Sequence, residues 1–341
     1  MSYTKNLTTS IDNPSNLSSD VLTDRTILLT GGTGSFGQAF VTEALKHSPS
    51  VIRIFSRGEY LQWEMAHKFN NDPRLRFFVG DVRDRERVYR AMAGAHIIVH
   101  AAALKQIPSC EYNPIEAIKT NVLGAINIID AAIDQGVEKV IAISSDKAIH
   151  PINLYGATKL CMEKLIIHAN VYTGTHKTRF SCVRYGNVMG SRGSVVPLFQ
   201  TQKLSRVLTI TDEKMTRFWI TLEQGVRFVI DCLGRMQGWE IFVPKLPSIR
   251  IVDLAQAIAP DAKQVTVGIR PAEKLHEILI PEEEAERVKE FENYFVVHPP
   301  FSTNLSEEGR ALAPGSQYSS DRNWFLNMDE IRELLKIADG K

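Results

Sequence analysis

The segment TILLTGGTGSFG, residues Thr26–Gly37, places an apolar run directly before a glycine-rich turn. The apolar run predicts a short buried strand, and the residues after the turn have the pattern of an amphipathic helix. Gly32, Gly34 and Gly37 fit the spacing GxGxxG, and Gly31 gives the alternative spacing GxxGxxG. Glycines let the backbone approach a pyrophosphate at a helix N-terminus, where free N–H groups favour an anion. The segment therefore predicts the strand, turn and helix that open a dinucleotide-binding fold.

Apolar runs and helical patterns alternate through the first half of the chain. The predicted strands are Thr26–Leu29, Val51–Phe55, Leu75–Val79, Ile97–His100, Val140–Ile143 and Arg179–Arg184. This alternation predicts an α/β fold, a Rossmann-like, doubly wound parallel sheet with helices on both faces. Ligands of such sheets bind beyond the carboxyl ends of the strands. The residues directly after each run are therefore the candidates for the site.

Small and polar residues follow these strands where a cofactor would lie. The predicted cofactor-binding residues are Gly31, Thr33, Gly34, Ser35, Phe36, Gly37, Ser56, Arg57, Asp81, Val82, Ala101, Ala102, Ala103 and Lys105. Arg57 stands where an NAD-selective site would carry an acidic residue, and its guanidinium suits the 2′-phosphate of NADP. We therefore predict NADP. The alternative is that Arg57 is solvated and that Glu59 binds the ribose.

Five candidate catalytic residues lie close together in the sequence. Ser145, Asp146 and Lys147 follow the strand Val140–Ile143, and Tyr155 and Lys159 come soon after. Tyr155 and Lys159 are four positions apart in a helical pattern that runs to residue 168, so they share one helix face. An ammonium beside a phenol lowers the phenol's pKa, which predicts Tyr155 as an acid/base. The alternative interpretations are a surface Tyr/Lys pair and a solvated Asp/Lys ion pair.

The composition is that of a soluble globular protein. The chain has 341 residues, 44% of them hydrophobic and 23% charged, and a formal net charge of +1. That charge argues against binding nucleic acid or a membrane surface through bulk charge. Its four cysteines lack CxxC spacing, so we expect no metal site, no disulfide framework and a reducing cytoplasmic location. Residues 1–24 are rich in Ser, Thr and Asn and are predicted to form a disordered arm, not a signal peptide.

The second half of the chain changes character. We assign residues 25–185 to an NADP-binding domain and 186–341 mainly to a smaller substrate-binding α/β lobe, with some segments returning to the first domain. Two arginines, Arg217 and Arg270, are predicted in irregular segments that suit a nucleotide diphosphate. The segments expected in this half are a loop at Ser191–Pro197 and helices at Arg270–Glu277, Pro281–Glu292 and Met328–Ile337.

Nine motifs together resemble one protein family. They are TGGTGSFG, SRGE, GDVRD, HAAALKQ, SSDK, NLYGATK, RYGNVMGSRGSVVP, MTRFWIT and RPAEKLHE. They are similar to the extended short-chain dehydrogenase/reductase superfamily and, within it, to the inverting UDP-N-acetylglucosamine 4,6-dehydratases that open pseudaminic acid synthesis. Two departures stand out: Ser145 replaces the family's threonine, and Ala272 replaces the glycine of RPGEKLHE. The sister group that retains the C5 configuration often has methionine where this chain has Tyr155.

The resemblance implies an NADP-dependent lyase that keeps its cofactor and regenerates it in every turnover. Tyr155, with Lys159 beside it, would take the C4 hydroxyl proton, and Ser145 would orient that oxygen. Lys147 would remove the C5 proton if its setting lowers its pKa, and a protonated Asp146 would help the C6 hydroxyl leave. The remaining expected contacts are Val188, Tyr155 and Lys159 to the cofactor, and Lys105, Asn187, Val195, Arg217, Arg270 and Glu273 to the substrate.

Other readings stay open. The enzyme alternatives are a retaining UDP-N-acetylhexosamine 4,6-dehydratase and a UDP-sugar C4 epimerase, which needs the Tyr/Lys pair but no acid/base pair for C6. A third alternative is an NADP-sensing regulator without turnover. The expected partners are UDP-N-acetylglucosamine and further copies of the chain, as a dimer or hexamer, with no nucleic acid and no membrane. The mass of the product would separate these functions.

Overall fold

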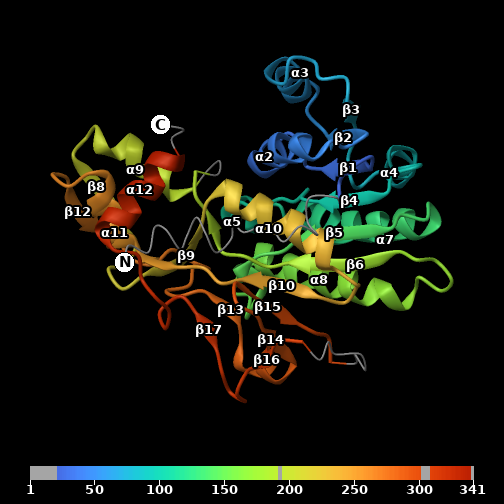
Figure 1. The fold of residues 1–341 in the computed structure, drawn as a ribbon. Coiled ribbons are helices and arrows are strands. Elements are labelled where there is room, and N and C mark those ends of the chain that lie inside the picture. Colours follow the sequence, from blue (N-terminus) through green and yellow to red (C-terminus); the bar gives the residue numbers. More distant parts are fainter. Residues whose placement is uncertain (1–20, 191–193, 301–307, 339–341) are drawn as a thin grey trace.

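The computed structural model describes residues 21–190, 194–300 and 308–338. Within them, ten strands form one sheet that crosses the molecule (Figure 1). Seven strands are parallel and follow the order β3 (Leu75–Val79), β2 (Val51–Ser56), β1 (Thr26–Thr30), β4 (Ile97–His100), β5 (Lys139–Ile143), β6 (Arg179–Val183) and β10 (Ile241–Pro244). Three antiparallel strands continue it, β15 (Tyr294–Val297), β14 (Val288–Glu290) and β16 (Arg310–Ala311). The predicted doubly wound parallel sheet is confirmed.

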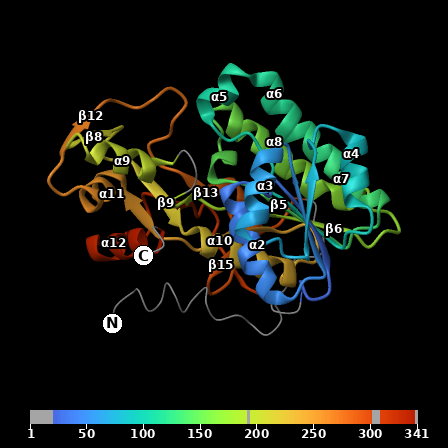
Figure 2. The ribbon, with the colours of Figure 1, turned by 90° about the horizontal axis from the view of Figure 1, so that it is seen from above.

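Helices cover both faces of this sheet. On one face lie α4 (Arg85–Met92), α7 (Gly124–Asp134) and α8 (Leu154–His168), and on the other lie α2 (Ser35–Ala44) and α10 (Leu222–Arg235) (Figure 2). The remaining helices of this half are α3 (Glu59–Lys68), α5 (Ile107–Tyr112) and α6 (Pro114–Ile118). A π-helical turn, Lys119–Leu123, joins α6 to α7.

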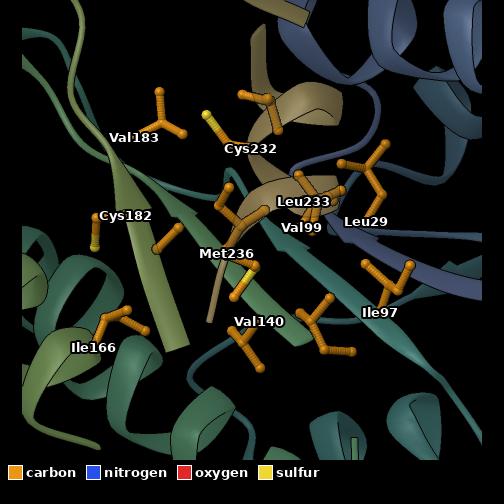
Figure 3. Close-up of a cluster of buried hydrophobic side chains, with 14 of the residues drawn as sticks. Leu29, Ile97, Val99, Val140, Ile166, Cys182, Val183, Cys232, Leu233 and Met236 are labelled. Atoms are coloured by element: carbon orange, nitrogen blue, oxygen red, sulfur yellow. The ribbon is translucent and has the colours of Figure 1, made fainter. Parts of the chain in front are cut away.

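The main core lies between the sheet and these helices. Figure 3 shows Leu29, Val99 and Val140 of three neighbouring strands in this cluster, with Leu233 of α10 packed on one side and Ile166 of α8 on the other. All five side chains are fully buried. Because both faces are covered, the strands read as continuous apolar runs, which is why the sequence located them well.

A smaller lobe carries a second core. Its strands are β7 (Asn187–Val188), β9 (Thr216–Ile220), β11 (Ser248–Arg250) and the parallel pair β8 (Val207–Ile210) and β12 (Lys263–Thr266). Its helices are α9 (Val195–Lys203), α11 (Ile251–Ile258) and α12 (Met328–Ala338), gathered at the left of Figure 1. Ile331, Leu334 and Leu335 pack into this core, so the prediction for the last helix is confirmed. A further short pair, β13 (Ile278–Ile280) and β17 (Tyr318–Ser319), lies beside it.

Two predicted helices of the second half are wrong. Arg270–Glu277 is irregular, because Ala272 has a φ of 63° and backbone in that region cannot continue a right-handed helix. Pro281–Glu292 forms a short 3₁₀ turn, Glu282–Arg287, followed by β14. The prediction assumed that the charged residues of this segment face solvent, but Glu284 is buried against Arg184.

Three further boundaries differ from expectation. Arg217 lies in strand β9 and is buried, whereas an irregular segment was predicted. Helix α9 begins at Val195, so the predicted loop is shorter, and Pro197 sits in the first turn where a missing N–H is tolerated. Leu22 is fully buried, so the predicted arm does not extend to residue 24. Residues 1–20 and 191–193 of these predictions lie outside the described residues.

No described helix has both the length and the apolar character needed to cross a bilayer. The four cysteines are free thiols, three of them buried and Cys161 exposed.

Candidate active site

A cavity of about 890 Å³ opens beyond the carboxyl ends of the central strands. Thr30 pairs with Phe55 and with His100, and His100 pairs with Ala142, so these strands end level with one another. The segments that follow the strands therefore meet at one edge. The predicted residues that line the cavity are Gly31, Thr33, Gly34, Ser35, Phe36, Ser56, Arg57, Asp81, Val82, Ala101, Ala102, Ala103, Lys105, Ser145, Lys147, Tyr155, Lys159, Asn187, Val188, Arg270 and Glu273.

Four predicted site residues do not line the cavity: Gly37, Asp146, Val195 and Arg217. Gly37 instead packs α2 against the turn, since a Cβ there would lie 2.3 Å from the carbonyl oxygen of Gly32. Val195 lies in the first turn of α9. Asp146 contacts Lys147, and Arg217 contacts Glu273, and both of these neighbours line the cavity.

The glycine-rich turn has the shape of a dinucleotide cradle. Gly31 has a φ of 68°, and a Cβ on it would lie 2.9 Å from the amide nitrogen of Ala102. Gly34 is the N-cap of α2, and as a glycine it has no side chain that could cap the N–H groups of the first turn. Such N–H groups suit a pyrophosphate. These observations fit a bound nicotinamide dinucleotide.

Thr30 and His100 fix the floor of this cradle. The Oγ1 atom of Thr30 lies 2.8 Å from Nδ1 of His100 and accepts a hydrogen bond from the Ala102 N–H at 3.2 Å. His100 is buried, and burial, together with the positive charge of Lys159, lowers its pKa to about 3. The ring is therefore neutral and anchors the Ala101–Ala103 segment.

The groups expected at the adenosine end lie on the cavity wall. Arg57 is exposed there, and the Ser56 hydroxyl accepts from Nε2 of Gln62 at 3.0 Å, which leaves its proton available. Asp81 is held by Arg83, whose NH2 donates at 2.7 Å. Burial would raise the pKa of Asp81, but bonds from Arg83 and the charge of Arg57 lower it. Asp81 is thus an anion within electrostatic reach of Arg57.

The segment after β5 brings the acid/base candidates together. Asp146–Ala148 form a 3₁₀ turn with Ser145 as its N-cap. Ser145 Oγ donates to Oδ1 of Asp146 at 2.8 Å, and Nζ of Lys147 donates to the same oxygen at 3.1 Å. Gly156 permits α8 to pack here, because a Cβ on it would lie 2.1 Å from the carbonyl oxygen of Lys147. The Asp/Lys pair and the Tyr/Lys pair are therefore packed against each other.

Tyr155 and Lys159 are both buried in α8, but their electrostatics differ from the prediction. Lys159 Nζ donates to the carbonyl oxygen of Ile143 at 2.7 Å, and burial lowers its pKa to about 8. Burial raises the pKa of Tyr155 to about 12, while the charge of Lys147 and a hydrogen bond with Ser145 oppose that rise. The prediction that Lys159 lowers the pKa of Tyr155 is wrong for this structure, because the ammonium that acts on the phenol is that of Lys147.

Lys147 is held as an ammonium ion. Burial would lower its pKa, but the carboxylates of Asp146 and Glu277 outweigh burial and raise that pKa above the ordinary lysine value. The condition set for Lys147 as a base, a lowered pKa, is therefore not met in this structure. Lys147 also donates to Oδ1 of Asn187 at 3.3 Å, which ties it to β7 of the smaller lobe.

Arg217 is a structural clamp in this structure. Its NH1 donates to the carbonyl oxygen of Leu275 at 3.0 Å, and its NH2 donates to that of Lys274 at 2.9 Å. Its NH2 also lies 3.5 Å from Oε1 of Glu273. Arg270 and Glu273 reach the cavity wall, so the loop that Arg217 holds forms part of that wall.

Sequence reasoning missed several polar groups around the cavity. Thr120 and Ser194 line it, and their hydroxyl oxygens are buried without a hydrogen-bond partner among the described residues. The same holds for one carboxylate oxygen each of Asp146, Glu273 and Glu277. Buried polar atoms without partners cost stability unless a ligand or water completes them. Glu277 was visible in the motif RPAEKLHE, but its partners are far away in the sequence.

Arg184 was also missed. Its side chain is fully buried at the end of β6, where NH2 donates to Oε1 of Glu163 at 2.5 Å and NH1 donates to Oε2 of Glu284 at 2.7 Å. Ser144 Oγ donates to Oε2 of Glu163 at 2.7 Å. This network joins helix α8, which carries Tyr155 and Lys159, to the chain after β13.

The strand order 3-2-1-4-5-6, the glycine-rich turn after β1 and the Tyr155/Lys159 pair beside one cavity define an extended short-chain dehydrogenase/reductase. Residues 27–299 match the family described as "Polysaccharide biosynthesis protein". The chain belongs to that family, and its similarity lies with the inverting nucleotide-sugar dehydratases described next.

The chain is 48% identical over 330 residues to the UDP-N-acetylglucosamine 4,6-dehydratase (inverting) of Campylobacter jejuni, covering 93% of this chain and 98% of that protein. It is 42% identical to a UDP-glucose 4-epimerase of Rickettsia conorii, covering 93% and 96%. The X-ray structure of Pen from Bacillus thuringiensis has a TM-score of 0.87 at 38% identity, covering 93% of this chain and 99% of that one.

Proposed function

We propose that this protein is an NADP-dependent UDP-N-acetylglucosamine 4,6-dehydratase that inverts C5 and performs the first step of pseudaminic acid synthesis for surface or flagellin glycosylation. The observation that carries the proposal is the contact between Lys147 and Asp146, 3.1 Å apart and packed against the helix of Tyr155. Removal of water across C5 and C6 needs a base and an acid in addition to the group that acts at C4. The similarity to the Campylobacter jejuni protein supports the same substrate.

Tyr155 is the proposed acid/base at the C4 oxygen. When bound, the nicotinamide ring would accept the C4 hydrogen as hydride and return it to C6. Tyr155 takes the C4 hydroxyl proton, and Ser145 orients that oxygen. The charge of Lys147 and the hydrogen bond with Ser145 favour the phenolate that this step requires, and burial opposes it.

Lys147 and Asp146 are the proposed pair at C5 and C6. Lys147 must be neutral to remove the C5 proton, and Asp146 must be protonated to help the C6 hydroxyl leave. Transfer of one proton from Lys147 Nζ to Asp146 Oδ1, over 3.1 Å, would produce both required forms at once. Asp146 does not line the cavity, so we expect its side chain to turn toward the sugar when the substrate binds. Reprotonation of C5 from the opposite face gives the inverted 4-keto-6-deoxy sugar.

Arg57, the glycine-rich turn and Ala101–Ala103 are proposed to hold NADP. The exposed guanidinium of Arg57 suits a 2′-phosphate, and the backbone N–H groups at the start of α2 suit the pyrophosphate. Arg270 and Glu273 are proposed for the UDP-sugar side, with Lys105 and Asn187 on the same cavity wall. Arg217 contributes by holding their loop.

Incubation of the purified protein with UDP-N-acetylglucosamine and NADP tests this function by product mass. Loss of one water supports a 4,6-dehydratase, and the configuration at C5, read by NMR, separates inverting from retaining enzymes. The relative from Rickettsia conorii favours C4 epimerisation as the second candidate. An unchanged mass with altered C4 stereochemistry would establish that candidate. No change at all would favour a regulator that binds NADP without turnover.

A further inference from the structure

Glu277 is a buried carboxylate beside the catalytic pair, in the loop that precedes β13. Its Oε1 lies 3.6 Å from Nζ of Lys147 and 3.9 Å from Nε of Arg217, and its Oε2 lies 3.7 Å from Nζ of Lys274. Only 2% of the residue is exposed. A carboxylate this deeply buried requires cations around it, and three elements supply them.

The backbone of Glu277 is fixed from two sides. Its N–H donates to Oγ of Ser320 at 2.9 Å, and its carbonyl oxygen accepts from the Ser320 N–H at 2.8 Å. The loop before it is fixed by Arg217, which donates to the carbonyl oxygens of Lys274 and Leu275. Lys274 in turn donates to the carbonyl oxygen of Ile149, just after the 3₁₀ turn that carries Asp146 and Lys147. Glu277 is thus rigidly placed.

We propose that Glu277 is a positioning residue for Lys147: its carboxylate holds the Lys147 side chain beside Asp146 and Asn187 at the cavity wall. The lysine nitrogen then lies 3.1 Å from Asp146 Oδ1, 3.3 Å from Asn187 Oδ1 and 3.6 Å from Glu277 Oε1. Two carboxylates from separate segments therefore share one ammonium ion. The importance of this arrangement for turnover rests on the proposed function, in which Lys147 acts at C5.

Other charges around Lys147 oppose or support the hold of Glu277. The titratable and charged groups that face Lys147 are Asp146, Glu277, Arg217, Tyr155, Lys105 and Lys274. The positive charges in this set disfavour the protonated form of Lys147. Without Glu277, Asp146 would be the main group that stabilises the Lys147 ammonium. Glu277 also sets the balance of the Lys147–Asp146 proton transfer, because its negative charge favours the proton on lysine.

The test measures the protonation of Lys147 directly in the free protein. Trace acetylation with acetic anhydride across a pH series, quantified by peptide mass spectrometry, gives the labelling midpoint of each lysine. Removing one carboxylate charge in Glu277→Gln should lower the Lys147 midpoint by about 1 pH unit or more, the size expected for loss of a close opposite charge. Lys46, an exposed residue after helix α2, is the internal reference.

Two further variants make the result decisive. Glu277→Asp keeps the negative charge but moves it away from Lys147 by one methylene, so it should lower the Lys147 midpoint by less than Glu277→Gln does. If the Gln variant does not fold, the Asp variant tests the proposal in its place. Glu283→Gln, which alters an exposed carboxylate beside His150, should leave the midpoint unchanged. Equal Lys147 midpoints in the unaltered chain and the Glu277 variants would overturn the proposal. The assay contains no sugar nucleotide, so its outcome is independent of whether the protein dehydrates UDP-N-acetylglucosamine.

Discussion

Asn153 Nδ2 donates a hydrogen bond to the carbonyl oxygen of Ala272 at 3.0 Å, and its Oδ1 accepts from the Gly156 N–H at 2.8 Å. One side chain therefore caps the helix of Tyr155 and also holds the loop that supplies Arg270 and Glu273. Ala272 itself has a φ of 63°, which is a strained backbone conformation for a residue with a Cβ.

Replacing Ala272 with glycine should relieve that strain. A non-glycine residue in the left-handed region costs roughly 1–2 kcal/mol, so Ala272→Gly should raise the free energy of unfolding by about 1 kcal/mol. Urea denaturation measures the change. The matched control is Ala66→Gly within α3, which should lower stability by about 1 kcal/mol because glycine is a poor helix former. A loss of stability in both variants would contradict the strain argument.

Replacing Arg57 with aspartate should weaken NADP binding. A charged hydrogen bond contributes about 1.5–3 kcal/mol, and the new carboxylate would also repel a 2′-phosphate. Calorimetric titration with NADP and with NAD measures the effect, which should be confined to NADP. Arg90→Asp, an exposed position on α4, serves as the control. Equal NADP affinity in the Arg57 variant and the unaltered chain would remove Arg57 from the cofactor site.

Replacing Tyr155 with phenylalanine should remove the acid/base at C4 and keep the ring. We expect the turnover rate to fall by roughly 10²–10⁴, the usual contribution of such a group, with NADP still bound. The rate of sugar-nucleotide conversion and the NADP affinity are measured together. Tyr112→Phe alters an 88% exposed tyrosine and should leave both values unchanged. Near-normal turnover of the Tyr155 variant would assign the C4 proton to another group.

Lys147 and Asp146 should affect the elimination and spare the oxidation at C4. In D₂O the unaltered enzyme should place deuterium at C5 of its product. Asp146→Asn should still oxidise C4, and Lys147→Ala should do so more slowly because the Lys147 charge no longer favours the Tyr155 phenolate, so reduced nicotinamide should accumulate on the enzyme without water loss. Absorbance and product mass report the two steps separately.

The result for this pair also separates the competing functions. Normal dehydration by both variants would make Asp146 and Lys147 a structural ion pair only. Loss of C4 oxidation in both would show that the pair shapes the cavity, because neither side chain is needed to take the C4 proton.

His100 should make stability fall in acid. Burial, followed by the charge of Lys159, lowers its pKa to about 3 from the ordinary value of 6.5. Between those values the unfolded chain binds a proton that the folded chain excludes, so stability declines as the pH falls through this window. His100→Gln should flatten the decline measured by urea denaturation over a pH series, whereas the exposed His67→Gln should not. An unchanged slope in the His100 variant would contradict this assignment.

The sequence predicted the central sheet well because both of its faces are covered. Strands such as Ile97–His100 read as uninterrupted apolar runs, and their boundaries agree with the structure. The glycine-rich turn could also be predicted from the sequence, because Gly31 and Gly37 occupy positions where a Cβ would clash with backbone atoms. Tyr155 and Lys159 could be placed on one helix face from their spacing alone.

The rest depended on contacts that no local pattern encodes. Glu277 meets Lys147 across 130 positions, so its contribution to the raised pKa of that lysine could not be anticipated from the sequence, unlike that of the adjacent Asp146. The charged segment Pro281–Glu292 read as a solvated helix because its buried partner, Arg184, lies in another part of the chain. Arg217 was expected to meet phosphate, but it uses its donors on the carbonyl oxygens of the adjacent loop.

The buried ion network of Arg184 also has a consequence for the order in which the molecule folds. Arg184 and Glu284 are 100 positions apart, and closing so long a segment carries an entropic cost. Until Glu284 has been synthesised, Arg184 has only Glu163 to balance its charge, and a buried charge with too few partners is strongly destabilising. The N-terminal strands can therefore assemble on the ribosome, whereas the catalytic helix is locked in place only after the last sixth of the protein begins to emerge. A nascent chain that ends before this point has its cofactor cradle but no completed active site.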